Sequence, residues 1–250
     1  MKSIILAAGV SIRLRPLTQY TPKCLLSVGR KPLLQRTLEN LFAAGISDVD
    51  IVTGFAAEKI GAFVRSTFPG RRIRFTTNIY YARTNNAYSL LLARRSLLNG
   101  NGSISHGFLL LDSDILFDGT LLPVLLDHPA ENRVAVRVAG PHDAEEVGVR
   151  VAEGNRIVQI GKEVLVEQTD GESIGIEYFS ASAAARLFEV LEHRVRAGAG
   201  RTEYYEAAFQ QMIDEGIDLT AVDVSGHPVL EIDTVRDLTN AERLAETLPG

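Results

Sequence analysis

The sequence predicts an α/β fold, in which a mixed and mostly parallel sheet is covered by helices on both faces and carries an antiparallel insertion. Two observations favour it. Up to about residue 120, apolar runs typical of buried strands alternate with segments of helical periodicity, which implies right-handed crossovers between parallel strands. Beyond that point, strands in which apolar and polar residues alternate follow one another without helices between them, as in antiparallel sheets.

The first half contains four expected strands and three expected helices. The strands are expected at 3–8, 49–55, 72–77 and 107–114, and the helices at 32–44, 56–67 and 86–98. In the first helix, Leu34, Leu38 and Leu41 have helical spacing, and Gly45 supplies a C-terminal stop. Ligands of such sheets bind beyond the carboxyl ends of the strands, so we expect the functional residues there.

The second half contains the antiparallel insertion and the last helices. Strands are expected at 133–139, 147–153, 156–161 and 173–179, and helices at 181–197 and 204–215. The tail 231–248 begins with a strand end and enters a helix through Thr234, with Asp237 three residues later as in a capping box. Because no Pro/Gly/Ser-rich linker separates the halves, we expect a single domain over 1–250, with an insertion that shapes a ligand pocket.

Composition and charge exclude several classes of protein. The net charge of −5 argues against broad nucleic-acid binding, although a local pocket for a small anion remains possible. The single cysteine, Cys24, excludes an internal disulfide and fits a cytoplasmic location. The amino-terminal apolar run is too short for a signal peptide, and no run of eighteen apolar residues occurs, so we expect no membrane partner.

The opening segment, MKSIILAAGVSIRLRPLTQYTPKCLLSVGRKPLL, combines a strand, a glycine and well-spaced cations. Gly9 lets backbone N–H groups approach a phosphate closely, and Arg13 and Lys23 can neutralise it from above. Pro16 and Pro22 stiffen the loop between them. The alternative is a solvated loop with ordinary surface cations. Neither the Walker loop nor the dinucleotide-binding glycine pattern is present.

The same segment resembles the signature of the nucleotidyltransferases that make nucleotide-sugars and related activated alcohols. The matching residues are Leu6, Ala7, Ala8, Gly9, Arg13, Leu14, Pro16, Leu17, Thr18, Pro22, Lys23, Leu25, Leu26, Pro32, Leu33 and Leu34. The resemblance implies a Rossmann-like three-layer α/β/α nucleotidyltransferase fold, with a nucleotide-binding half at 1–120 and an acceptor-binding half at 121–250. It implies that Arg13 and Lys23 are catalytic phosphate contacts, and that the nucleotide lies over Leu6, Ala7, Ala8, Gly9, Val10 and Ser11. Ser11 stands where a second glycine is usual, which puts the nucleotide affinity in doubt.

Two groups of acids are candidates for holding Mg²⁺, the cofactor that phosphoryl chemistry usually needs. The first group is Asp112 and Asp114, and the second is Glu231 and Asp233. Asp112 and Asp114 end an apolar strand, and their spacing predicts that both project from the same edge. The alternative is that they only end the strand in solvent. The resemblance implies that Asp114 and Asp233 are the metal ligands and that Asp112 contacts the nucleotide. It makes Glu231 a helper of the metal site and an acceptor contact.

The segment NIYYARTNNAYSLLLA bears on the choice of nucleotide. Asn85, Asn86 and Ser89 open the predicted helix at 86–98, where amide groups can read one edge of a base. The alternative is that the asparagines only cap this helix. The pattern resembles bacterial cytidylyltransferases acting on choline phosphate, aminoethylphosphonate and inositol-type phosphates. The resemblance therefore implies CTP as a substrate.

The acceptor is less well defined than the nucleotide. Lys162 is a candidate contact for an anionic acceptor group, with Glu231 and Tyr205 as further candidates, although a solvated lysine is an equal alternative. Five tyrosines can form an aromatic cage for choline, namely Tyr80, Tyr81, Tyr178, Tyr204 and Tyr205. Glu203 and Glu206 can instead bind an amine. The absence of tryptophan favours a phosphonate or polyol phosphate over choline phosphate.

The resulting hypothesis is a Mg²⁺-dependent enzyme that transfers CMP from CTP to a small phosphate or phosphonate acceptor and releases pyrophosphate. Two alternatives compete with it: a sugar-1-phosphate uridylyl- or guanylyltransferase, and a nucleotide-sensing protein on an inactive scaffold. The expected partners are CTP and the acceptor, without nucleic acid, and a homodimer is compatible with the sequence.

Overall fold

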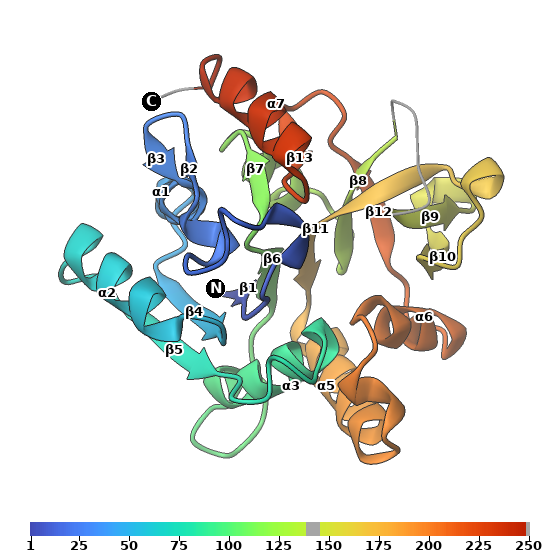
Figure 1. The fold of residues 1–250 in the computed structure, drawn as a ribbon. Helices are drawn as coiled ribbons and strands as arrows, with labels where there is room; N and C mark the ends of the chain where they lie inside the picture. The colour runs from blue at the N-terminus through green and yellow to red at the C-terminus, as the bar shows by residue number, and fades with distance from the viewer. Residues whose placement is uncertain (139–145, 249–250) are drawn as a thin grey trace.

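The computed structural model describes residues 1–138 and 146–248, and its centre is a nine-stranded mixed sheet (Figure 1). The strands of this sheet are β1 (Lys2–Ala7), β4 (Asp48–Thr53), β5 (Ile73–Thr77), β6 (Phe108–Asp112), β8 (Arg133–Arg137), β9 (Val147–Val151), β10 (Ile157–Gly161), β11 (Gly171–Phe179) and β12 (Thr220–Asp223). The main path through the sheet is β10-β9-β11-β6-β1-β4-β5, and β8 joins it by pairing with β11 and β12.

The first half forms the parallel part of the sheet, as predicted. β1 pairs in parallel with β4 on one side and with β6 on the other, and β4 pairs in parallel with β5. The connecting helices are α1 (Leu33–Ala43), α2 (Ala57–Thr67) and α3 (Asn86–Leu97). The apolar runs of β1 and β6 are explained by this arrangement, because central strands are covered on both faces.

Helices cover both faces of the sheet and give it three layers. Alternate residues of β1 face opposite layers: Ile4 packs with α3, α5 (Ala181–Arg196) and α6 (Glu206–Asp214), whereas Ile5 packs with α1, α2 and α4 (Leu121–Leu126). A smaller core lies between α7 (Val235–Ala245), Leu14 and Leu116. The two-residue period of a strand places consecutive side chains in different layers.

The second half extends the same sheet with antiparallel strands. β11 pairs antiparallel with β6, β8 and β9, and β9 pairs antiparallel with β10. The register of β11 shifts between Ser173 and Glu177, where Gly175 has a φ of +70°. A Cβ on Gly175 would lie 2.9 Å from Asp112 Oδ2, so glycine is required here by conformation and by space.

The structure also contains elements that the sequence pattern did not predict. β12 pairs in parallel with β8, although only antiparallel pairing was expected in this half. Two small sheets are new: β7 (Ile115–Phe117) with β13 (Val229–Glu231), and β2 (Ser27–Val28) with β3 (Lys31–Pro32). Strands of two or three residues show too little periodicity to be recognised, and they depend on a partner for stability. Of the predicted strand 133–139, the last residue lies outside the described residues.

Two local expectations have opposite outcomes. The capping box at the start of α7 is confirmed: the Thr234 side chain accepts from the Asp237 backbone, and Asp237 accepts from the Thr234 backbone. The expected strand 107–114 is too long, because β6 ends at Asp112 and Asp114 lies in the turn before β7. Among the described helices, none combines the length and the apolarity needed to cross a membrane.

Candidate active site

A cavity of about 250 Å³ lies at the carboxyl ends of β1 and β6, the place where a parallel sheet of this kind is expected to bind ligands. Both halves of the chain line it. Most of the predicted site residues are in this lining, namely Leu6, Ala7, Ala8, Gly9, Ser11, Arg13, Lys23, Asn85, Asn86, Ser89, Asp112, Asp114, Lys162, Glu231 and Asp233. Val10 and Tyr205 are the two predicted residues outside it.

The floor of the cavity is the turn that follows β1. A Cβ on Gly9 would meet no atom within 4 Å, so the space above this residue is open to a ligand. Ser11 adopts a left-handed φ of 52°, and its carbonyl accepts a hydrogen bond from Thr18 Oγ1 at 2.7 Å. This backbone conformation is the one that glycine adopts without strain, which explains why glycine is usual at this position in the resembling family.

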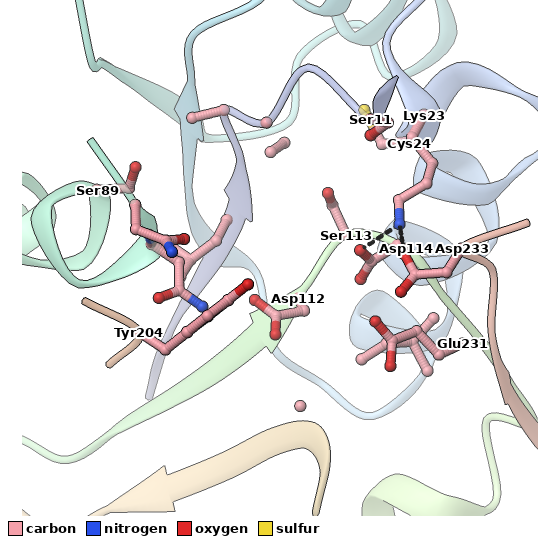
Figure 2. Close-up of a pocket in the computed structure, with 18 of the residues that line it drawn as sticks. Ser11, Lys23, Cys24, Ser89, Asp112, Ser113, Asp114, Tyr204, Glu231 and Asp233 are labelled. Carbon is pink, nitrogen blue, oxygen red and sulfur yellow. Dashed lines mark hydrogen bonds and ion pairs between the residues drawn. The ribbon is translucent and has the colours of Figure 1, made fainter. Parts of the chain in front are cut away.

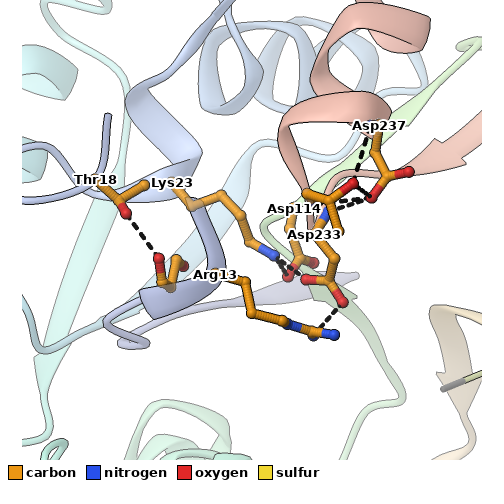
Figure 3. Close-up of polar contacts among 8 residues, drawn as sticks. Arg13, Thr18, Lys23, Asp114, Asp233 and Asp237 are labelled. Atoms are coloured by element: carbon orange, nitrogen blue, oxygen red, sulfur yellow. Dashed lines mark hydrogen bonds and ion pairs between the residues drawn. The ribbon is translucent and has the colours of Figure 1, made fainter. Parts of the chain in front are cut away.

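Four charged side chains form an ion-pair network above this floor (Figure 3). Lys23 Nζ lies 2.7 Å from Asp114 Oδ2 and 2.6 Å from Asp233 Oδ1, and the Arg13 guanidinium pairs with the other oxygen of Asp233. Lys23 is 9% exposed, whereas half of the Arg13 side chain is accessible. The network therefore joins the opening motif to two acids that lie far away in the sequence.

The protonation of the network follows from this geometry. Burial disfavours the charged form of Lys23, but Asp114 and Asp233 outweigh it and raise the pKa of the ammonium. Burial likewise disfavours ionised Asp233, but Lys23 and then Arg13 outweigh it and lower the pKa of this carboxyl. Both residues are therefore charged at neutral pH.

Three carboxyls are placed to hold a divalent cation. Asp114, Glu231 and Asp233 each offer an oxygen within 4.8 Å of the other two. Asp114 Oδ1 is buried and has no hydrogen-bond partner, so one acceptor of the group is unsatisfied. A set of hard carboxylate oxygens with an unsatisfied member fits Mg²⁺. Desolvation by surrounding groups, followed by repulsion from Asp114 and Asp233, raises the pKa of Glu231 to about 8, even though its side chain still reaches solvent.

The turn before α7 fixes the position of Asp233. The Asp233 backbone N–H donates to Asp237 Oδ2 at 3.2 Å, and the Ile232 N–H donates to the Asp114 carbonyl at 3.0 Å. Asp237 therefore serves the helix start, as predicted, and it also orients the residue before the cap. The backbone bond from Ile232 ties the two candidate ligand segments together.

Asp112 and Asp114 both line the cavity beyond the end of β6, the edge expected for them, but their carboxylates have different partners. Asp112 accepts a hydrogen bond from Tyr205 Oη at 2.8 Å, whereas Asp114 pairs with Lys23. Figure 2 shows Asp112 on the side of the cavity nearer Tyr204, and Asp114 beside Asp233. The two-residue alternation applies only within a strand, and β6 has already ended when Asp114 is reached. Burial, then Asp114 and Glu206, raise the pKa of Asp112 well above its usual value.

The asparagines at the start of α3 have structural contacts of their own. Asn85 is the N-cap residue, and its side chain accepts from the Asn86 N–H at 2.8 Å. Asn86 Oδ1 accepts from the Tyr205 N–H at 2.9 Å, and Ser89 Oγ accepts from Asn78 Nδ2 at 3.0 Å. The capping role is thus present, and these residues also line the cavity. A role in base recognition stays a prediction.

The far end of the cavity contains the candidate acceptor residues. Lys162 Nζ lies 4.8 Å from the centroid of the Tyr204 ring. Tyr205, a predicted acceptor contact, is fully buried outside the cavity lining, and its hydroxyl donates a hydrogen bond to Asp112. Of the other tyrosines considered for a cage, Tyr81 lines the cavity, whereas Tyr178 lies under the Arg133 guanidinium. The tyrosines therefore do not assemble into a single cage.

Sequence reasoning missed several lining residues, including Thr84, Ser113, Ser173 and Gly175. Ser113 lies between Asp112 and Asp114, so its place in the sequence could have identified it as a site residue. The others lie in a loop or at the register shift of β11, where no residue pattern indicates the cavity. These residues reach the cavity because of the way the parallel and antiparallel parts of the sheet pack together.

Comparison with known proteins identifies the family of the chain. A family model described as "Nucleotidyl transferase" matches residues 2–193. The chain is 26% identical over 245 residues to the choline-phosphate cytidylyltransferase of Streptococcus pneumoniae, covering 98% of both chains. It is 25% identical over 236 residues to the 2-aminoethylphosphonate cytidylyltransferase of Lancefieldella rimae, covering 94% of this chain and 89% of the relative.

A solved structure supports the fold independently. The inositol-1-phosphate CTP transferase from T. maritima superposes with a TM-score of 0.79 at 21% identity, covering 100% of this chain and 98% of that one. At this identity the likeness concerns the fold. Because the family model spans more than half of the chain, the protein belongs to the nucleotidyl transferase family.

Proposed function

We propose that the protein transfers CMP from CTP to a small phosphate or phosphonate acceptor and releases pyrophosphate. The observation that carries the proposal is the Arg13–Lys23–Asp114–Asp233 network at the floor of the cavity, together with the unsatisfied Asp114 Oδ1. The choice of CTP and of a small acceptor is supported by the similarity to the two cytidylyltransferases, which extends over nearly the full length of each chain.

The reaction needs no nucleophilic side chain. An anionic oxygen of the acceptor attacks the α-phosphorus of CTP; the new O–P bond forms while the bond to the bridging oxygen breaks, and pyrophosphate leaves with that electron pair. Asp114 and Asp233, with Glu231, would hold Mg²⁺, which when bound supplies charge neutralisation at the phosphates. The chain's own contribution is alignment of the two anions and stabilisation of the developing charge.

Lys23 and Arg13 supply the positive charge from the protein. Both approach Asp233, and both stand over the Gly9–Ser11 turn that would carry the phosphates. Lys23 is held at a fixed place by two carboxylates, which keeps its ammonium charged and oriented. Such preorganised charge costs little reorganisation when negative charge develops on the leaving pyrophosphate.

The experiment is pyrophosphate release measured with each of the four ribonucleoside triphosphates and Mg²⁺, against a panel of small phosphates, phosphonates and sugar 1-phosphates. We expect turnover with CTP and a small acceptor. Turnover only with UTP or GTP and a sugar 1-phosphate would instead support the sugar-nucleotide alternative. Nucleotide binding without any turnover would support the sensing protein. The Asp114→Asn variant serves as the inactive control.

A further inference from the structure

Behind the acceptor end of the cavity lies a buried acid cluster, which we define as Asp112, Glu177, Glu206 and the hydroxyl of Tyr205. Asp112 ends β6, Glu177 belongs to β11, and Glu206 opens α6. Tyr205 donates to Asp112 at 2.8 Å, and Ser173 Oγ donates to Glu177 at 3.4 Å. Asp112 and Glu206 both line the cavity, so two acids of the cluster face the ligand space.

Glu177 and Glu206 each have a buried oxygen without a hydrogen-bond partner, and of these two residues Glu206 is the one that lines the cavity. It is 6% exposed, and its Oε2 is buried without a hydrogen-bond partner. Burial of a carboxylate oxygen without a donor is costly, and native proteins rarely leave such an atom unmatched unless a ligand completes it. Burial is also the main reason that the pKa of Glu206 rises to about 7, against an opposing effect of Lys162.

The nearest cation does not satisfy this oxygen. Lys162 lies over the Tyr204 ring, and among the described residues no ion pair within 4.0 Å joins Lys162 to Glu206. Burial, followed by the charges of Asp112 and Glu206, also raises the pKa of Glu177 well above its usual value. The acceptor end therefore holds more acidic than basic side chains, and one carboxyl oxygen of its lining residues has no donor.

We propose that the acceptor carries a protonated amine with at least one N–H group, and that Glu206 accepts from this group and determines specificity for it. The inference rests on the proposed function and narrows its acceptor class. A trimethylammonium head brings positive charge but no N–H donor, so it would leave Oε2 unsatisfied. A hydroxyl brings a donor but no charge, so it would not stabilise the ionised form of Glu206. Only an amine supplies both.

Two matched pairs of acceptors test this on the native enzyme, with CTP and Mg²⁺. The first pair, 2-aminoethylphosphonate and 2-hydroxyethylphosphonate, differs in charge at the terminal group. The second pair, phosphoethanolamine and phosphocholine, differs in the presence of N–H donors. We expect kcat/KM to be about 10- to 100-fold higher for the amine member of each pair, because a site built for a charged donor discriminates strongly against an analogue without it.

The Glu206→Gln variant assigns the preference to this residue. We expect KM for the amine acceptor to rise about 10- to 100-fold while KM for CTP stays unchanged, and the preference within both pairs to disappear. Glu203→Gln is the matched control, because Glu203 lies in the same segment but pairs with Arg194 at 2.8 Å. This control should retain the preference.

The outcomes separate the inference from the proposed function. Turnover with CTP that is equal for the amine, hydroxyl and trimethylammonium acceptors would overturn the amine inference and leave the cytidylyl transfer intact. An amine preference that survives in Glu206→Gln would overturn the assignment to Glu206. Absence of CTP turnover with every acceptor would overturn both proposals.

Discussion

The two ends of the cavity differ in whether their acidic side chains form ion pairs with the protein's own cations. At the phosphate end, the acids Asp114 and Asp233 meet the cations Lys23 and Arg13 in direct ion pairs. At the acceptor end, Asp112 and Glu206 line the cavity; Asp112 accepts from the Tyr205 hydroxyl, and Lys162 lies over the Tyr204 ring without an ion pair to Glu206 among the described residues. The protein's own cations therefore pair with the acids of the phosphate end, but not with the acids of the acceptor end.

This difference indicates what each end requires from a ligand. At the phosphate end, Lys23 and Arg13 pair with the carboxylates; under the proposed function, a divalent cation and a triphosphate would enter together and exchange partners with them. In the acceptor end, the missing partner is a cationic donor, which the protein does not supply. The burial of charge without a partner lowers the stability of the folded chain, and ligand binding can recover that energy.

The largest expected effect comes from removing a charge at the phosphate end. We expect Asp114→Asn to lower kcat/KM by roughly 10³-fold, because it removes both a candidate cation ligand and a partner of Lys23. Initial rates of pyrophosphate release over a range of Mg²⁺ concentrations measure this loss, and circular dichroism checks that the variant is folded. A folded variant with near-native turnover would show that the ion-pair network is not the reaction site.

A smaller loss should follow when the cation of the same end is removed. We expect Lys23→Met to lower kcat by about 100-fold, because the ammonium is buried and fixed between two carboxylates. Arg13→Ala should cost less than Lys23→Met, since half of the Arg13 side chain is solvent-exposed. Steady-state kinetics of the two variants side by side gives the ranking. The reverse order would contradict the role assigned to burial.

At the acceptor end, removing a charge should stabilise the unliganded protein. The folded pKa of Glu206 is about 7, against about 4.5 in the unfolded chain. Between these values only the unfolded state releases its proton, so this residue lowers the stability of the native fold as the pH rises, and the loss is complete above about pH 7. We expect Glu206→Gln to be about 3 kcal/mol more stable than native at pH 8 and equally stable at pH 4.

Urea unfolding at the two pH values measures this difference without any substrate. Glu203→Gln is again the control, and it should show no gain that grows with pH. A Glu206→Gln variant that is less stable than native at pH 8 would mean that the carboxylate is satisfied in the folded protein. The contrast between the two ends of the cavity would then be wrong.

The smallest expected effect concerns the support of Asp233. Thr234→Ala removes the side chain that accepts from Asp237 at the start of α7. We expect a loss of about 1 kcal/mol in the free energy of unfolding, the usual cost of losing a helix cap, and a modest increase in the Mg²⁺ concentration needed for half-maximal rate. Thermal unfolding and a magnesium titration measure the two effects. An unchanged magnesium dependence would show that Asp237 alone holds the turn.

The sequence by itself determined the order of the elements and the floor of the cavity. Strand and helix periodicity reflects which side of each segment is buried, so the parallel strands and the helices other than α4 were predictable to within a few residues. The Gly9–Lys23 segment is contiguous, and its turn conformation is set by neighbouring residues, including the left-handed Ser11 that stands at a usual glycine position.

Only the tertiary structure decided which side chains meet. The Lys23 contact with Asp233 joins residues 210 positions apart, and the Tyr205 contact with Asp112 joins residues 93 positions apart. It also gave Asp112 and Asp114 different partners, and it left Oε2 of Glu206, a residue of the cavity lining, buried without a donor. Local sequence patterns indicate which side of each helix or strand is buried. Ion pairs and buried acids without a partner depend instead on distances and burial that arise only when segments distant in the sequence pack together.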